Sequence, residues 1–135
     1  MIRGQCIGIE MSKSIKSYKD LEIWKRSMAL VKTLYRVTSR FPSTELYSLT
    51  NQIRRSVISI PVNIAEGWGR ETTKSYIQFL RNSRGSLFEL ETLILISDDL
   101  KYIKPEISND LHSEMDEIGR MLNSLINKLN SKVAD

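Results

Sequence analysis

The sequence predicts an all-α protein, an antiparallel up-down-up-down four-helix bundle with a kinked second helix. Apolar residues recur at helical spacing in four separate segments, each of about twenty residues or more. The connections between these segments are short and contain the prolines and glycines that end helices. The sequence contains no alternating strand pattern and no internal repeat that would favour another fold over these helices. Short connections between long amphipathic helices favour antiparallel neighbours, which makes the bundle the predicted architecture.

The first helix is expected from Asp20 to Arg40. Two adjacent apolar stripes, which together cover about half of the helix circumference, predict it. The stripes consist of Trp24, Met28, Val31, Tyr35 and Thr38, and of Ile23, Leu30, Leu34, Val37 and Phe41. The remaining face carries a basic ridge, with Arg26 nearby. This ridge comprises Lys25, Lys32, Arg36 and Arg40.

The second helix is expected to begin with a cap from Ser43 or Thr44. Its near-heptad seam comprises Leu46, Leu49, Ile53, Val57, Ile60 and Ile64. Pro61 lies inside this seam, where its missing N–H and its clash with a carbonyl cost roughly 3 kcal/mol. Because the seam continues beyond it, Pro61 is expected to kink the helix without ending it. Gly67 and Gly69 are expected to end the helix.

The third and fourth helices have equally clear boundaries. Thr72 or Thr73 can cap the third helix, and Pro105 suits the first position of the fourth. Apolar residues surround most of the third helix between Leu87 and Ile96, and the first helix also has a wide apolar face. Excess apolar surface of this kind indicates a partner interface, so we expect a homo-oligomer.

One domain, residues 18–131, accounts for all four helices. Residues 1–17 have no sustained periodicity and are expected to form a flexible arm, and either Met1 or Met11 can be the true start. The single cysteine, Cys6, excludes an internal disulfide and favours a reducing, cytoplasmic location. No signal peptide and no membrane-spanning run is evident.

The charge is unevenly distributed along the chain. Residues 1–70 carry 12 Lys/Arg against 5 Asp/Glu, a balance of +7, whereas residues 71–135 carry 8 against 11, a balance of −3. This pattern indicates a polyanionic partner, or oppositely charged surfaces that meet in an oligomer, or an ordinary solvated surface. The candidate nucleic-acid contacts are the ridge with Arg26, followed by Arg54, Arg55, Arg81 and Arg84.

A polar cluster follows the second-helix seam and comprises Pro61, Asn63, Glu66, Gly67 and Arg70. We interpret it as a structural latch in which Asn63 and Glu66 are at least partly buried and meet arginine partners. The alternative, a carboxylate–amide catalytic pair, lacks a nucleophile and a metal ligand. His112 is the only histidine, so we predict no catalytic residues, no metal site, no cofactor and no enzymatic activity.

Several short motifs occur in a fixed order between residues 18 and 102, namely YKDL with Trp24, FP with Glu45, QIRR, SIPVNIAEG with Arg70, FL with RGSL, and ELE. In these motifs and their order the chain resembles the proteins encoded in intervening sequences of bacterial 23S ribosomal RNA genes. Serines at 48 and 56 replace the glycine and alanine usual in that family. The resemblance implies a ring-like homopentamer without catalytic activity. Its relatives include basic accessory proteins of diversity-generating retroelements, which bind nucleic acid and a reverse transcriptase.

Two functional hypotheses follow. The first is a non-enzymatic oligomer that binds RNA or RNA/DNA non-specifically through its basic surfaces, with a nucleic-acid-processing protein as a further partner. The second is a structural or protein-docking oligomer whose basic surface meets an acidic protein.

Overall fold

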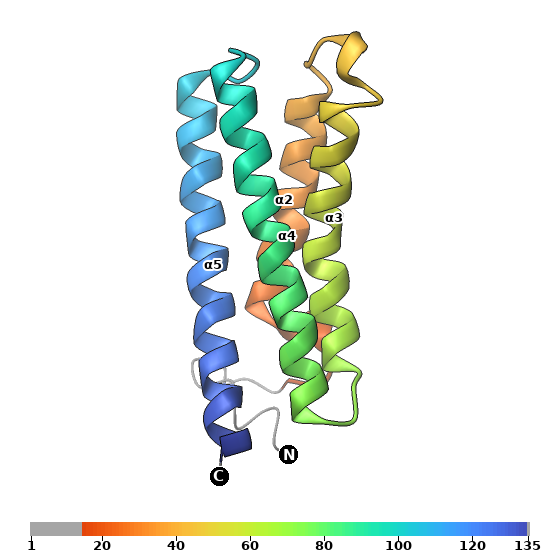
Figure 1. Ribbon diagram of the computed structural model, residues 1–135, viewed down its shortest axis with the longest axis vertical. Coiled ribbons are helices and arrows are strands. Elements are labelled where there is room, and N and C mark those ends of the chain that lie inside the picture. Colours follow the sequence, from red (N-terminus) through yellow and green to blue (C-terminus); the bar gives the residue numbers. More distant parts are fainter. Residues whose placement is uncertain (1–14, 135) are drawn as a thin grey trace.

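The computed structural model describes residues 15–134, which fold into four packed α-helices without a strand (Figure 1). The helices are α2 (Glu22–Thr38), α3 (Leu49–Trp68), α4 (Thr73–Asp99) and α5 (Pro105–Ala134), and two short 3-10 helices are η2 (Tyr18–Asp20) and η3 (Ser43–Glu45). The all-α, four-helix prediction is confirmed. Residues 1–14 of the predicted arm lie outside the described residues, whereas Ile15 packs against the core.

Each helix packs against the next one in the chain, and α5 also packs against α2. Figure 1 shows the four helices side by side, with the α3–α4 turn at one end of the molecule and the α4–α5 connection at the other. The α3–α4 contact is the most extensive and the α2–α5 contact the least. The groove between α2 and α5 is therefore the most open seam between neighbouring helices.

Most predicted helix boundaries are correct, but the predicted cap of the second helix is wrong. Residues Ser43–Glu45 form η3, and α3 begins only at Leu49. The Glu45 carboxylate accepts hydrogen bonds from the Ser48 hydroxyl at 2.7 Å and from the Tyr102 hydroxyl at 2.9 Å. These contacts hold Glu45 in the connection, in place of the first helical turn that sequence propensity favoured.

The caps of the last two helices agree with the sequence. The Thr72 hydroxyl accepts a hydrogen bond from the Ser75 amide at 3.1 Å, which caps α4. Pro105 is the first residue of α5. Helix α3 continues through Pro61, whose side chain is buried, and its predicted kink stays a prediction.

Serines line the contact between α3 and α4. The Ser56 hydroxyl donates to the Ser86 carbonyl oxygen, and the Ser83 hydroxyl donates to the Ile60 carbonyl oxygen, both at 2.8 Å. Ser83 is fully buried. Small side chains let the two backbones approach closely, and these hydrogen bonds satisfy hydroxyls that would otherwise be costly to bury. The serines thus contribute hydrogen bonds across the α3–α4 contact.

Candidate nucleic-acid interface

The residues of the basic ridge, on α2 and in the turn that follows it, are exposed, as their spacing predicted. Lys32, Arg36 and Arg40 are exposed and make no ion pair with any other residue among 15–134. Arg36 makes a long hydrogen bond to the Thr33 hydroxyl at 3.4 Å, and Lys25 pairs loosely with Glu22 at 3.8 Å. Three adjacent cations therefore face solvent without a neighbouring carboxylate to neutralise them.

Arg26, predicted beside the ridge, is engaged within the fold. Its Nε and Nη2 donate to the two carboxylate oxygens of Glu114 on α5 at 2.9 and 3.0 Å. This hydrogen bond raises the pKa of Arg26, whereas the guanidinium's partial burial opposes the rise. A two-point guanidinium–carboxylate contact fixes geometry as well as charge. Arg26 therefore clamps α2 to α5 and contributes little free charge to the ridge.

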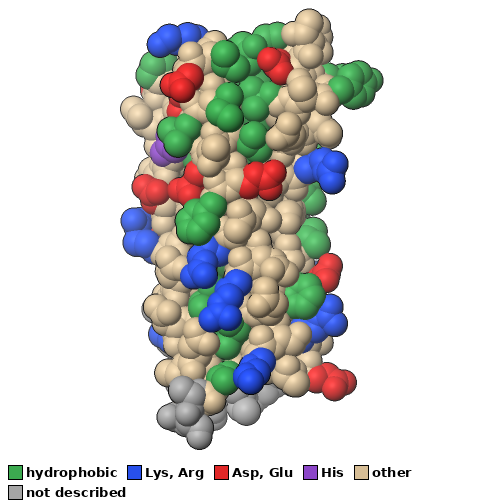
Figure 2. Space-filling view, viewed as in Figure 1, with side chains coloured by type: hydrophobic (Ala, Val, Ile, Leu, Met, Phe, Trp, Pro, Cys, Tyr) green, Lys and Arg blue, Asp and Glu red, His purple; other side chains and the backbone are tan. Residues whose placement is uncertain are grey.

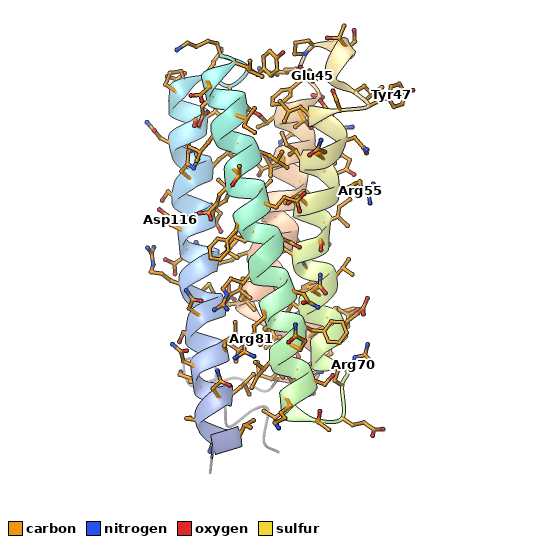
Figure 3. The ribbon with its side chains drawn as sticks, viewed as in Figure 1. Glu45, Tyr47, Arg55, Arg70, Arg81 and Asp116 are labelled. Atoms are coloured by element: carbon orange, nitrogen blue, oxygen red, sulfur yellow. The ribbon has the colours of Figure 1, made fainter. Side chains whose placement is uncertain are left out.

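The other candidate arginines are spread over separate faces. Arg54 lies over the Tyr35 ring at 4.5 Å and donates to the Thr38 hydroxyl at 3.0 Å, so it braces α3 against α2. Arg84 donates to Asn123 of α5 at 3.0 Å. Arg55 and Arg81 are exposed, and Figure 3 shows them on different helices. The structure does not join them to the α2 ridge.

The predicted latch residues lie in the second half of α3 and just after it, and the arginine partner expected of them is found for Glu66 but not for Asn63. The Asn63 side-chain amide is half-buried and donates to the carbonyl and hydroxyl oxygens of Ser59 at 2.8 and 2.9 Å. The Ser59 hydroxyl in turn accepts from Ser86 of α4 at 2.8 Å. Asn63 thus joins a polar network between helices without meeting an arginine.

Glu66 contradicts the burial expected of it. Its side chain is 53% exposed and meets Arg70, one helical turn later, at 3.8 Å. Arg70 also covers the Phe79 ring at 4.4 Å. Position 66 points away from the buried side of α3, so water solvates the carboxylate. Exposed pairs of this kind contribute about 0–1 kcal/mol, which limits what Glu66 adds to the stability of one subunit.

Two apolar surfaces remain uncovered. A shallow groove of about 340 Å³ between α2 and α3 is lined by Trp24, Met28, Ile58 and Val62 among others. On α4 and at its C-cap, the exposed large apolar side chains are Phe88, Leu95, Ile96 and Leu100. Figure 2 shows apolar side chains gathered toward one end of the α4 face and Lys and Arg toward the other. Such surfaces mark contacts with other molecules.

Trp68 and His112, the two isolated side chains of functional interest, both have structural partners. Trp68 is 9% exposed and meets the Tyr76 ring edge-on at 6.3 Å, as a core cap would. His112 lies 2.9 Å from an Asp98 carboxylate oxygen. Burial, together with the charge of Asp116, raises the pKa of nearby Glu91.

Within residues 15–134 no cluster of His, Cys, Asp and Glu has the arrangement of a metal site. No helix in this part of the chain combines the length and the apolar character needed to cross a membrane.

The fold and the exposed cations together define a class of protein, an all-α protein of four packed helices that carries a basic ridge on its surface. The family model described as 23S rRNA-intervening sequence protein matches residues 19–124. The chain therefore belongs to this family, which the order of its motifs predicted. No curated protein matches the sequence.

Proposed function

We propose that the chain is a non-enzymatic, cytoplasmic oligomer that binds nucleic acid without reading its sequence. The observation that carries the proposal is the row of exposed cations Lys32, Arg36 and Arg40, on α2 and in the turn that follows it, which make no ion pair with a residue among 15–134. Each phosphate that such a side chain neutralises releases counterions, so the affinity is high at low salt and independent of sequence. The family name, which refers to 23S rRNA, supports RNA as the ligand, and RNA/DNA hybrids present the same phosphates.

The proposed assembly is a ring of five up-down-up-down bundles. The exposed apolar side chains of α4 and of the α2–α3 groove support self-association, and the number five follows from the family resemblance. Repeating the ridge around a ring converts weak contacts into useful affinity. A protein that processes nucleic acid is a further proposed partner, because it would meet the same strand.

Reversing two charges of the ridge, Lys32→Glu with Arg36→Glu, is expected to weaken the binding of every nucleic-acid sequence alike. The slope of log K against log salt should fall by about 0.9 for each duplex phosphate that the variant no longer neutralises. Fluorescence anisotropy with mixed-sequence RNA and DNA duplexes at several salt concentrations measures both quantities.

The matched control is Glu106→Lys with Asp110→Lys, which changes two exposed charges on α5 in the opposite sense. A folded ridge variant that keeps the wild-type mass, affinity and salt slope would contradict the proposal. Both ridge positions are exposed, so the variant should melt like the wild type.

The second candidate function is docking to an acidic protein. The observation that favours it is the apolar α2–α3 groove, which lies on the same helix as the ridge and would suit a mixed protein interface. The anisotropy experiment separates the two: the absence of RNA and DNA binding at low salt favours the protein partner.

Charge placed on the outer face of α4 is expected to dissociate the oligomer without unfolding it. Ile96 is 43% exposed, so Ile96→Glu should leave a folded subunit of lower mass, whereas Leu93, which is 7% exposed, should not tolerate Leu93→Glu. Light scattering at micromolar concentration and circular dichroism measure mass and folding. A wild-type chain that is monomeric under these conditions would refute the oligomer.

A further inference from the structure

A pocket of about 550 Å³ lies in the open groove between α2 and α5, beside the α4–α5 connection. The last turns of α2 and the two residues after it form one wall, and the connection with the first turn of α5 forms the other. Its volume is within the range of about 300–1,000 Å³ that is typical of small-molecule sites. Two residues of the basic ridge, Arg36 and Arg40, line this pocket, whereas Lys25 and Lys32 do not.

Three cations line this pocket and no carboxylate does. They are Arg36 from α2, Arg40 from the turn that follows it and Lys104 from the α4–α5 connection, and none of them makes an ion pair with another residue among 15–134. The next hollow along the same groove contains Asp110 and Glu114 together with Arg26. The lining of the first pocket therefore carries three positive charges and no negative one, which favours an anionic ligand.

The rest of the pocket wall is apolar and includes an aromatic ring. Val37, Ile107 and Tyr102 line it. The Tyr102 hydroxyl donates to Glu45 at 2.9 Å, and its ring packs against Phe41 with 5.3 Å between centroids. Hydrogen bonds from Ser48 and Tyr102 lower the pKa of Glu45, so this carboxylate remains an ionised acceptor at neutral pH. The ring is therefore held in place beside the three cations.

The backbone of the connection explains how these residues meet. Lys101 adopts a left-handed conformation with φ of 65°, and the next amide, of Tyr102, donates to the Ser97 carbonyl oxygen at 3.0 Å. This is the hydrogen-bond pattern that reverses the chain at a helix end. The reversal brings Tyr102 and Lys104 to the end of α2, although they are far from it in sequence.

We propose that this pocket binds a phosphorylated nucleotide. Arg36, Arg40 and Lys104 hold the phosphate, as guanidinium and ammonium groups do elsewhere. The base or ribose lies on Tyr102 and the neighbouring aliphatic side chains, since an aromatic ring accepts any base by stacking. The ligand has two possible sources, a free mononucleotide or the phosphorylated end of a strand. The strand end rests on the proposed nucleic-acid binding, whereas the free nucleotide does not.

The decisive variant is Lys104→Glu, because Lys104 lies in the pocket and is not part of the ridge. It is exposed and should fold, which circular dichroism checks. Lys74→Glu is the matched control, with the same charge change on an exposed residue of α4. The probes are adenosine 5′-monophosphate, adenosine, inorganic phosphate, and one short single-stranded RNA with and without a 5′-phosphate. Calorimetry or anisotropy measures each affinity.

The expected result is that the phosphorylated probes bind more tightly than adenosine, inorganic phosphate and the unphosphorylated RNA. Lys104→Glu should weaken their binding about tenfold or more, as the loss of a charged hydrogen bond predicts, and Lys74→Glu should not. Tighter binding of the phosphorylated RNA than of the mononucleotide identifies a strand end, and the reverse identifies a free nucleotide. Phosphorylated probes that bind no better than their unphosphorylated forms, or equally well to both lysine variants, overturn the proposal.

A separate variant distinguishes this site from the proposed function. Lys25→Glu with Lys32→Glu removes ridge charges outside the pocket and should weaken duplex binding while leaving mononucleotide affinity unchanged. A protein that binds the mononucleotide but no duplex retains the pocket and lacks the proposed function. A protein that binds duplex through the ridge but binds no phosphorylated probe in the pocket has the proposed function and lacks the nucleotide site.

Discussion

Replacing Ile60 with alanine is expected to lower the free energy of unfolding by about 2–5 kcal/mol. Ile60 is fully buried in α3, and its carbonyl oxygen accepts the Ser83 hydroxyl across the α3–α4 contact. Truncation removes apolar contacts and leaves a cavity that this close backbone packing cannot collapse to fill. Urea unfolding at a fixed subunit concentration measures the change, and the m value should stay constant.

Ile58→Ala is the matched control for this prediction. It lies on the same helix but is 39% exposed and lines the α2–α3 groove, so the stability of one subunit should change far less. If the groove is a subunit contact, Ile58→Ala should instead lower the oligomer mass. Equal destabilisation by the two variants would contradict the assigned core.

Gly67→Ala is expected to lower the free energy of unfolding by about 1–3 kcal/mol, the range of overpacking. A Cβ atom at Gly67 would lie 2.9 Å from the Phe79 Cβ and 2.9 Å from the Tyr76 Cδ1. Phe79 Cβ is anchored to the backbone, and the Tyr76 ring is fully buried, so neither can move cheaply. Thermal or urea unfolding measures the destabilisation. An unchanged stability would show that the α3–α4 end can open to admit a methyl group.

Gly85→Ala should have the opposite effect. Gly85 lies inside α4, and beyond its own helix backbone and chain neighbours no atom of residues 15–134 lies within 4 Å of a Cβ placed there, so alanine meets no obstacle in this part of the chain. Alanine restricts the unfolded backbone and favours the helix, which should add about 0.5–1 kcal/mol. Destabilisation by Gly85→Ala would place this glycine in a contact between subunits.

The four helices could be predicted because their signals are local. Helical spacing of apolar residues shows in a window of a few turns, and Thr72 and Pro105 mark two starts through contacts within their own first turn. The start of α3 could not be predicted in this way. There the contact of Glu45 with Tyr102, a residue 57 positions later, outweighs the local preference of Ser43 and Thr44 for a cap.

The sequence by itself determined the all-α class, the four helical segments, the α2 ridge and the family. Only the tertiary structure decided which of the charged residues are available. Arg26 and Glu114 are 88 positions apart, and their pairing removes one predicted cation from the interface. Glu66 faces water although its spacing suggested burial, and Lys104 joins Arg36 and Arg40 in one pocket. Periodicity identifies the face of a helix on which a residue lies, whereas the distance between residues on different helices depends on how the helices pack.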